Sequence, residues 1–316
     1  NKKDYALLFE NEDQRHHIPV EATQQLNIYG EITLTSSVLK TISEKNIRVV
    51  FSDKYGDLLG HFVPSEYSSS AIISEKQFSI YNDDKKRLEL AKKFEISGIH
   101  NMRANIRYYN KKTKGEFDDT IRTLSACIAE VVKEQKVENL MLIEARARQN
   151  YYQAFNHIME NEDFRFSKRT RRPPEDNLNA MISFGNTLLY NYILQIIWRS
   201  SLDPRVGIIH AANNRSHTLN LDFADIFKPV IVDRIIFSLV NCHQMKSEHF
   251  EKKNGGVYLN KEGKKIFVTA FENKLNQKLV QKENKALTYR QLLEKEVRDY
   301  QHYIQEERKY KPYKYY

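Results

Sequence analysis

Asp222 and Asp225 stand three residues apart in the otherwise apolar segment "TLNLDFADIFKPVIV". If this segment is helical, the spacing brings the two carboxylates close together, and they repel each other unless a positive charge lies between them. One explanation is a solvated helix edge whose acids are neutralised by Lys228 and Arg234. The other explanation is a divalent metal ion buried between the two acids.

Glu144 and His210 are two further side chains that could do chemistry. Glu144 lies in the segment "NLMLIEARARQNYY" with Arg148 one helical turn later, and such a pair is usually a surface ion pair. His210 ends the apolar run "GIIH" and precedes the turn-forming pair Asn213-Asn214. A histidine in such a place is more often a hydrogen-bonded core or loop residue than a ligand. Neither residue identifies a site on its own.

Basic residues without acids gather in the segment "FRFSKRTRR". A segment of this kind is either a solvated loop or a contact for the phosphates of DNA. A second basic segment, "ERKYKPYKYY" at the C-terminus, alternates lysines with tyrosines. Such a segment either stacks on nucleic acid or forms a packed or frayed tail, and the tail is the favoured interpretation. The basic residues of the first segment are Arg165, Lys168, Arg169, Arg171 and Arg172.

The composition favours a polyanionic partner. The 316 residues include 50 lysines and arginines against 41 aspartates and glutamates, which leaves a net charge of +9. This balance favours nucleic acid, with an anionic membrane surface as the alternative. No apolar stretch approaches the roughly 20 residues of a membrane span and no leader opens the chain, so we expect a soluble, cytoplasmic protein. Cys127 and Cys242 are too few for a cysteine zinc site unless histidines complete it, and both are expected to be inert core residues.

The elements that must position these residues change in type along the chain. Up to about residue 82, short runs of β-forming residues predict strands. The runs "IRVVFSD" and "LLGHFVP" are expected to form a hairpin through residues 54–57, and "SSVLKTISEK" is the only helix predicted here. The predicted strands are "ALLFE", "HHIPVE", "LNIYGEITLT", "IRVVFSD", "LLGHFVP" and "AIISEKQFSIY".

From residue 83 onward, apolar residues recur at the helical period, interrupted by a small hairpin predicted at Gly255-Gly256. One helix is expected over residues 217–234, bent at Pro229 because proline has no N–H to bond the carbonyl of Asp225. The fold class is therefore α+β, with a β domain over residues 1–82 and a larger helical domain over residues 83–316. The apolar stripe of the helix at 217–234 is Leu219, Phe223, Ile226, Phe227, Val230 and Ile231.

Three separated segments resemble one protein family. They are "LIEARARQNYY", "RRPPEDNLNAMISFGNTLLY" and "HAANNRSHTLNLDFADIFKPVIVDR", in this order and near this spacing. The sequence resembles the CRISPR-associated endonuclease and integrase family, the first of the two universal CRISPR adaptation proteins, written here as Cas-one. The resemblance covers almost the whole chain and looks like the members that accompany type I-B systems. It implies an N-terminal β-sandwich domain followed by a larger all-helical catalytic domain, in agreement with the change in pattern near residue 82.

The resemblance also implies a metal site and a reaction. The family's metal ligands fall on Glu144, His210 and Asp225, and Asp222 matches a further acidic position that lines the site. The ion would be Mg²⁺ or Mn²⁺, and one imidazole among oxygen ligands favours Mn²⁺ somewhat. The implied reaction is a transesterification, in which the 3′-hydroxyl of a captured DNA fragment attacks a phosphodiester at the edge of a CRISPR repeat. A metal-dependent nuclease that mainly cleaves DNA and a non-catalytic DNA-binding scaffold stay open as alternatives.

The partners implied by the resemblance are double-stranded DNA fragments, the CRISPR repeat, the small second adaptation protein (Cas-two) and the Cas-four nuclease, with no membrane. A homodimer through the β domain is also implied. Two departures from many relatives concern the site. The segment Ala145-Arg146-Ala147-Arg148 makes the surroundings of the predicted catalytic Glu more basic, and Asp225 stands where many relatives carry Glu. Its carboxylate therefore reaches about one methylene less far.

Overall fold

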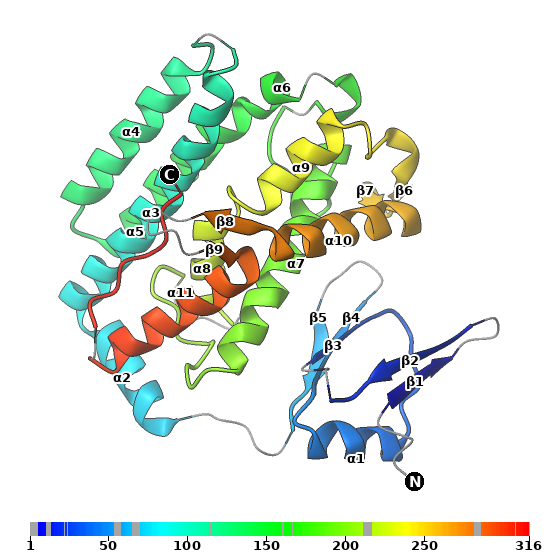
Figure 1. Cartoon of the computed structure of the whole chain (residues 1–316). Helices are drawn as coiled ribbons and strands as arrows, with labels where there is room; N and C mark the ends of the chain where they lie inside the picture. Colours follow the sequence, from blue (N-terminus) through cyan, green and yellow to red (C-terminus); the bar gives the residue numbers. More distant parts are fainter. Residues whose placement is uncertain are drawn as a thin grey trace. The chain divides into compact units, whose positions relative to one another are not determined.

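The chain divides into two compact units, Asn1–Ser68 and Ser69–Tyr316. In the computed structural model (Figure 1), the described residues of the first unit form five strands and one helix, and the second unit is mainly helical. The structure describes residues 6–10, 14–21, 23, 25–53, 58–64, 70–113, 115–159, 161–165, 167–210, 217–280, 286–306 and 308–315.

The first unit combines two small sheets with one helix. Strand β1 (Ala6–Glu10) pairs antiparallel with β2 (Arg15–Pro19). Strand β3 (Gln25–Tyr29) pairs in parallel with β4 (Arg48–Ser52), which pairs antiparallel with β5 (Leu58–Phe62). A parallel pair needs a crossover connection, and helix α1 (Ser36–Glu44) lies within it. Five predicted strands and the predicted helix are therefore confirmed.

The core of the first unit is shared between strands and helix. Ile42 of α1 and Val49 of β4 are fully buried, and Leu26 and Ile28 of β3 are buried in the same cluster. The predicted β-sandwich is not confirmed, because a helix contributes to this core and the sheets have only two and three strands. The turn predicted at residues 54–57 lies outside the described residues, whereas the pairing of β4 with β5 is confirmed.

Residues 71–82 form a helix, not the predicted strand. Helix α2 (Ala71–Asn82) starts at Ser70, whose side chain accepts a hydrogen bond from the backbone nitrogen of Ile73 at 3.4 Å. Ile73 and Gln77 are buried one turn apart, and Gln77 exchanges two hydrogen bonds with the backbone of Asp203, at 2.8 and 3.1 Å. The run "AIISEKQFSIY" is compatible with both periods, and this tertiary contact favours the helix. The division between units therefore falls at residue 68, not at the predicted residue 82.

The second unit is built from helices and two small hairpins. The predicted hairpin at Gly255-Gly256 is confirmed as β6 (Phe250–Lys253) with β7 (Gly256–Leu259), while β8 (Lys278–Val280) with β9 (Ala286–Thr288) was not predicted. No helix in the described part of the chain is both long and apolar enough to cross a membrane. The helices are α3 (Asp84–Asn110), α4 (Asp118–Lys133), α5 (Val137–Gln153), α6 (Phe155–Ile158), α7 (Asn177–Trp198), α8 (Leu219–Phe227), α9 (Val232–Asn241), α10 (Lys261–Asn276) and α11 (Tyr289–Ile304), with short 3-10 helices at η1 (Glu162–Phe164) and η2 (Ser247–His249).

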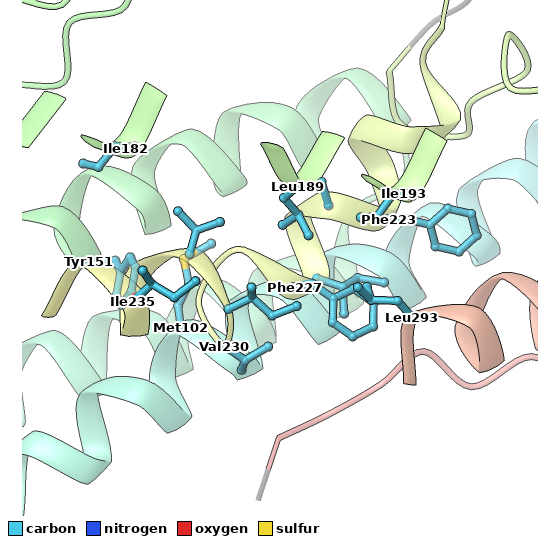
Figure 2. Packing of buried hydrophobic residues seen from close by; sticks show 14 of the residues in the cluster. Met102, Tyr151, Ile182, Leu189, Ile193, Phe223, Phe227, Val230, Ile235 and Leu293 are labelled. Atoms are coloured by element: carbon cyan, nitrogen blue, oxygen red, sulfur yellow. The ribbon is translucent and has the colours of Figure 1, made fainter. Parts of the chain in front are cut away.

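Helix α7 lies at the centre of the second unit's core. Its residues are buried along nearly its whole length, and Figure 2 shows Leu189 and Ile193 of α7 near Phe223 of α8. Gly185 of α7 is required for the packing of α7 against α9, because a Cβ there would lie 2.6 Å from a methyl carbon of Val232. Cys127 is buried as predicted, but Cys242 at the end of α9 is exposed, so the prediction of a core cysteine is wrong there.

The C-terminal residues 308–315 form a packed tail along α3 (Figure 1, red). Tyr310 is 1% exposed, and its hydroxyl donates to Glu296 of α11 at 2.5 Å. The Tyr313 carbonyl accepts from Asn101 at 3.2 Å, and the Tyr315 nitrogen donates to Asn101 at 2.7 Å. The favoured interpretation of a tail, rather than a nucleic-acid platform, is confirmed in its packed form.

Candidate active site

The two aspartates lie on a helix that ends early. Helix α8 stops before Pro229 and α9 starts after it, so the expected bend is a full break. The break frees backbone carbonyls, and two asparagines of α3 satisfy them: Asn101 donates to Ile226 at 2.9 Å, and Asn105 donates to Pro229 at 3.0 Å. All residues of the predicted apolar stripe, which runs from Leu219 in α8 to Ile231 after the break, are buried. These contacts fix α8, and with it both aspartates, against α3.

Asp222 is a fully buried carboxylate that positions His210. One of its oxygens lies 2.7 Å from His210 Nδ1 and accepts from the His210 backbone nitrogen at 3.1 Å. The other oxygen accepts from the backbone nitrogen of Ile208 at 2.5 Å and from that of Ile209 at 3.3 Å. A carboxylate only accepts, so Nδ1 carries a proton, and in the neutral ring Nε2 has the lone pair that a ligand or substrate needs. The solvated helix edge is therefore wrong for Asp222.

Arg148 bridges Glu144 of α5 and Asp225 of α8. Its guanidinium donates to Glu144 Oε1 and lies 3.0 Å from Asp225 Oδ1. The Lys228 ammonium is 2.5 Å from the same Asp225 oxygen and 4.7 Å from the centroid of the Tyr190 ring. The pair Glu144–Arg148 exists as the spacing suggested, but it is mostly buried and is shared with a third residue. Glu144 and Asp225 thus converge on one cationic group.

Mutual attraction controls the protonation of this cluster. Burial alone would raise the pKa of Asp225, but Lys228 and Arg148 hold it below its usual value. Burial would likewise lower the pKa of Lys228 and Arg148, yet the facing carboxylates raise both. Burial lowers the pKa of His210, and the hydrogen bond and charge of Asp222 outweigh this effect and raise it. The site is therefore a compact network of opposed charges.

Glu95 of α3 is a further acid beside this network that the sequence did not reveal as such. It is 5% exposed, and burial raises its pKa well above the usual value, with Glu144 and Asp225 adding to the rise and Arg148 opposing it. Gly98, one turn later, allows the close approach of α3, because a Cβ there would lie 3.2 Å from the Asp225 carbonyl oxygen. Burial and the neighbouring carboxylates therefore favour the protonated, neutral form of Glu95.

Glu144, His210 and Asp225 are the residues that could hold a divalent metal ion. Within the described ranges, no three His, Cys, Asp or Glu side chains form a ready-made metal cluster, and the Arg148 guanidinium lies between the two carboxylates. The donor set nevertheless fits Mg²⁺ or Mn²⁺. Two carboxylates already converge on one positive group, and the hydrogen bond that His210 donates to Asp222 fixes the imidazole as metal-ligating histidines require.

The five basic residues predicted to contact DNA differ in their surroundings. Arg169 is partly buried, and its guanidinium donates to Asn179 and to Ser183, both at 2.8 Å, so it braces the start of α7. Arg165 is exposed but is paired with Glu162 at 2.8 Å. The other members of the cluster have exposed side chains, and they are Lys168, Arg171 and Arg172.

Comparison with known proteins decides the family. The model of the family described as CRISPR associated protein Cas1 matches residues 1–273. The chain belongs to this Cas1 family.

A CRISPR-associated endonuclease Cas1 of Thermodesulfovibrio yellowstonii is 40% identical over 99% of this chain and 94% of its own. The structure of a Cas1 protein from Thermotoga maritima has 34% identity and a TM-score of 0.84, covering 98% of this chain and 94% of that one. A casposase bound to integration product, at 22% identity and a TM-score of 0.84, covers 96% of this chain and 86% of its own and shows the shared fold alone.

Sequence reasoning missed two features of this Cas1-family chain that lie at the site. Glu95 falls on the apolar stripe of α3, four residues after Ala91 and four before Ile99, and this position was the available signal for burial. The second partner of Arg148 lies 77 residues further along the chain, so local spacing could not reveal it. Both features depend on how α3, α5 and α8 pack together.

Proposed function

We propose that this protein is a metal-dependent DNA endonuclease and integrase of CRISPR adaptation. The observation that carries the proposal is the convergence of Glu144 and Asp225 on one cationic group, beside a histidine held by Asp222. Membership of the Cas1 family, whose relatives are named endonucleases, supports the same activity. A scaffold that only binds DNA would use the same acids as structural partners of Arg148 and Lys228, and it would change no phosphodiester bond.

The proposed reaction is a transesterification. The 3′-hydroxyl oxygen of a captured DNA fragment forms a bond to a phosphorus at the edge of a CRISPR repeat, and the bond from that phosphorus to the 3′-oxygen of the cut strand breaks. The number of phosphodiester bonds is unchanged, so the exchange needs no external energy source. Attack by water on the same phosphorus would be cleavage, the activity in the relatives' names.

The residues of the site have separate parts in this chemistry. Glu144, Asp225 and Nε2 of His210 would hold the divalent ion, which supplies Lewis-acid stabilisation of the charge that develops on the phosphate. Asp222 keeps the His210 ring in the orientation and tautomer that a ligand needs. Lys228 anchors Asp225 through an ion pair of 2.5 Å.

The DNA and protein partners belong to the same proposal. Lys168, Arg171 and Arg172 have exposed side chains suited to phosphates of a double-stranded fragment or of the repeat, whereas Arg169 is committed to α7. Dimerisation through the first unit, assembly with Cas-two and cooperation with Cas-four rest on the resemblance to the family. The basic net charge of +9 agrees with a DNA partner.

The test is gel-resolved strand transfer to a repeat-bearing plasmid, with Mn²⁺ or with a chelator, beside filter binding of the same DNA. Asp225→Asn removes one anionic ligand at constant size, so joining should fall by orders of magnitude while DNA affinity without metal stays equal or rises slightly. Asp119→Asn, at an aspartate whose side chain is 89% exposed on α4, is the matched control and should join normally. Joining that persists in the chelator or in Asp225→Asn would refute a metal-dependent site at these residues.

A further inference from the structure

Arg148 is an enclosed arginine whose two acidic partners are both proposed metal ligands. It is 7% exposed, and its guanidinium reaches Glu144 Oε1 and Asp225 Oδ1, the second at 3.0 Å. Glu144 lies on its own helix α5, and Asp225 lies on α8. The planar fork of arginine suits this contact, because two carboxylates can be bound by one charge. Arg148 therefore links the two helices through the oxygens that an ion would use.

Two permanent cations already face the carboxylates that are proposed as ligands. Arg148 contacts both Glu144 and Asp225, and Lys228 contacts Asp225. The third basic side chain of the cluster, His210, contacts Asp222 instead. Adding an ion of charge +2 among these enclosed charges is opposed by the two cations present.

Of these basic groups, Arg148 is the one placed to compete with the ion. His210 is turned toward Asp222 and is itself a proposed ligand. Lys228 contacts Asp225 alone among the acids in the described contacts, and it also faces the Tyr190 ring. Arg148 contacts Glu144 and Asp225 together, so it and a bridging ion need the same two oxygens.

We infer that Arg148 is an internal counterion that competes with the divalent ion for Glu144 and Asp225, so that metal binding requires the guanidinium to leave its bridging position. This inference rests on the ligand set of the proposed function. It assigns Arg148 two opposite effects: it stabilises the protein when no metal is bound, and it weakens the affinity for metal. A residue that only packed, or that helped to hold the ion, would not have both effects.

The decisive variant is Arg148→Gln in the full chain. Its Mn²⁺ affinity, measured from the electron paramagnetic resonance signal of free Mn²⁺, should be about tenfold or more higher than that of the unaltered protein, within the range by which neighbouring groups change metal affinity. Its melting temperature in chelator should fall, because Glu144 and Asp225 then repel each other, and added Mn²⁺ should restore more of it than in the unaltered protein. Adding Asp225→Asn to this variant should abolish the gain in affinity, which places the gain at this site.

Arg146→Gln is the matched control. Arg146 lies two residues away on α5, but its side chain is 53% exposed and pairs with Glu130 across to α4, so its loss should leave Mn²⁺ affinity unchanged. Arg148→Lys keeps the charge and loses the fork, so it should fold and bind Mn²⁺ with intermediate affinity even if the Gln variant does not fold.

Equal or weaker Mn²⁺ binding by both Arg148 variants would overturn the inference. If the unaltered protein binds Mn²⁺ at Asp225 and joins DNA, that result leaves the proposed function intact. If the unaltered protein and all variants bind no Mn²⁺, and if the chelator does not reduce the joining of DNA, the proposed function fails together with the inference. Tight binding that appears only after Arg148 is replaced would support the inference directly.

Discussion

The carboxylate of Asp222 holds His210 at two points, at the ring Nδ1 (2.7 Å) and at the backbone nitrogen (3.1 Å). Its second oxygen accepts hydrogen bonds from the backbone nitrogens of Ile208 and Ile209. One buried side chain therefore fixes the backbone of the segment that ends at His210. Gly207 is part of this arrangement, because a Cβ there would lie 2.8 Å from the His210 carbonyl and 3.0 Å from Asp222 Oδ2. Asp222 thus acts on the site by positioning His210.

Asp222→Asn should therefore impair both stability and activity. An amide offers one accepting oxygen in place of two, so buried backbone N–H groups lose their acceptor at a cost of about 1–3 kcal/mol each. Loss of the fixed imidazole should lower metal affinity or strand transfer by roughly 10–100-fold. Thermal melting, Mn²⁺ titration and strand transfer measure these effects, with Asp119→Asn as the control. A variant with normal melting and normal joining would show that Asp222 does not position His210.

The three proposed ligands should act as one unit. Glu144→Gln, His210→Ala and Asp225→Asn should each reduce strand transfer by orders of magnitude, and a double variant should lose little more than a single one. Rates of joining with saturating Mn²⁺ measure the effect, and circular dichroism checks folding. Losses that multiply in the double variants would indicate residues that work independently, not one metal site.

The exposed arginines should contribute to DNA binding without sequence preference. Arg171→Ala with Arg172→Ala should weaken binding to all duplexes and reduce the slope of log affinity against log salt by up to ~0.9 per lost phosphate contact. Arg169→Ala should instead lower the melting temperature, because the hydrogen bonds that its guanidinium donates to Asn179 and Ser183 are lost. The double variant Lys261→Ala with Lys265→Ala removes the same charge from the exposed face of α10 and serves as the control. An unchanged salt slope after loss of both arginines would exclude them as contacts.

Local pattern predicted the elements that bury a continuous stripe. The stripe from Leu219 to Ile231 and the break at Pro229 follow from helical period and from the missing N–H of proline. Residues 71–82 were predicted as a strand because their local pattern fits both a strand and a helix. The contact of Gln77 with Asp203 favours the helix, and no local pattern contains that contact. The ligand set came from the resemblance to the family. The positions of Glu95 and Arg148 at the site could not be predicted, because they depend on the packing of three helices distant in sequence.

The boundary at residue 68 can be tested with two fragments. A fragment starting at Ser70 should keep the helical circular dichroism and cooperative melting of the second unit, because its core is its own. A fragment starting at Asp83 lacks α2, leaves the Asp203 backbone without Gln77, and should melt at a lower temperature. Equal melting of the two would show that α2 does not belong to this unit. If the first unit forms the dimer, both fragments should sediment as monomers.

Glu296 should make stability depend on pH. Burial is the main cause that raises its pKa from 4.5 to about 7, opposed by the hydrogen bonds from Tyr310 and Tyr313. Between about pH 4.5 and pH 7, the folded protein therefore keeps a proton on Glu296 that the unfolded chain has released. This contribution to stability is complete below about pH 4.5 and is lost as the pH rises through 7. The shift corresponds to about 3 kcal/mol, since each pKa unit is about 1.4 kcal/mol.

Glu296→Gln isolates this effect, because glutamine resembles the protonated acid and still accepts from Tyr310 and Tyr313. Urea denaturation at pH 5 and pH 8 should show the unaltered protein losing more stability at pH 8 than the variant does. Asp233, whose pKa burial raises to about 7, adds to the slope of both proteins and cancels in the comparison. Glu294→Gln, on the same helix with a side chain 40% exposed, is the control and should keep the unaltered slope. If Glu296→Gln loses as much stability between pH 5 and pH 8 as the unaltered protein, Glu296 of α11 does not hold a proton in the folded protein.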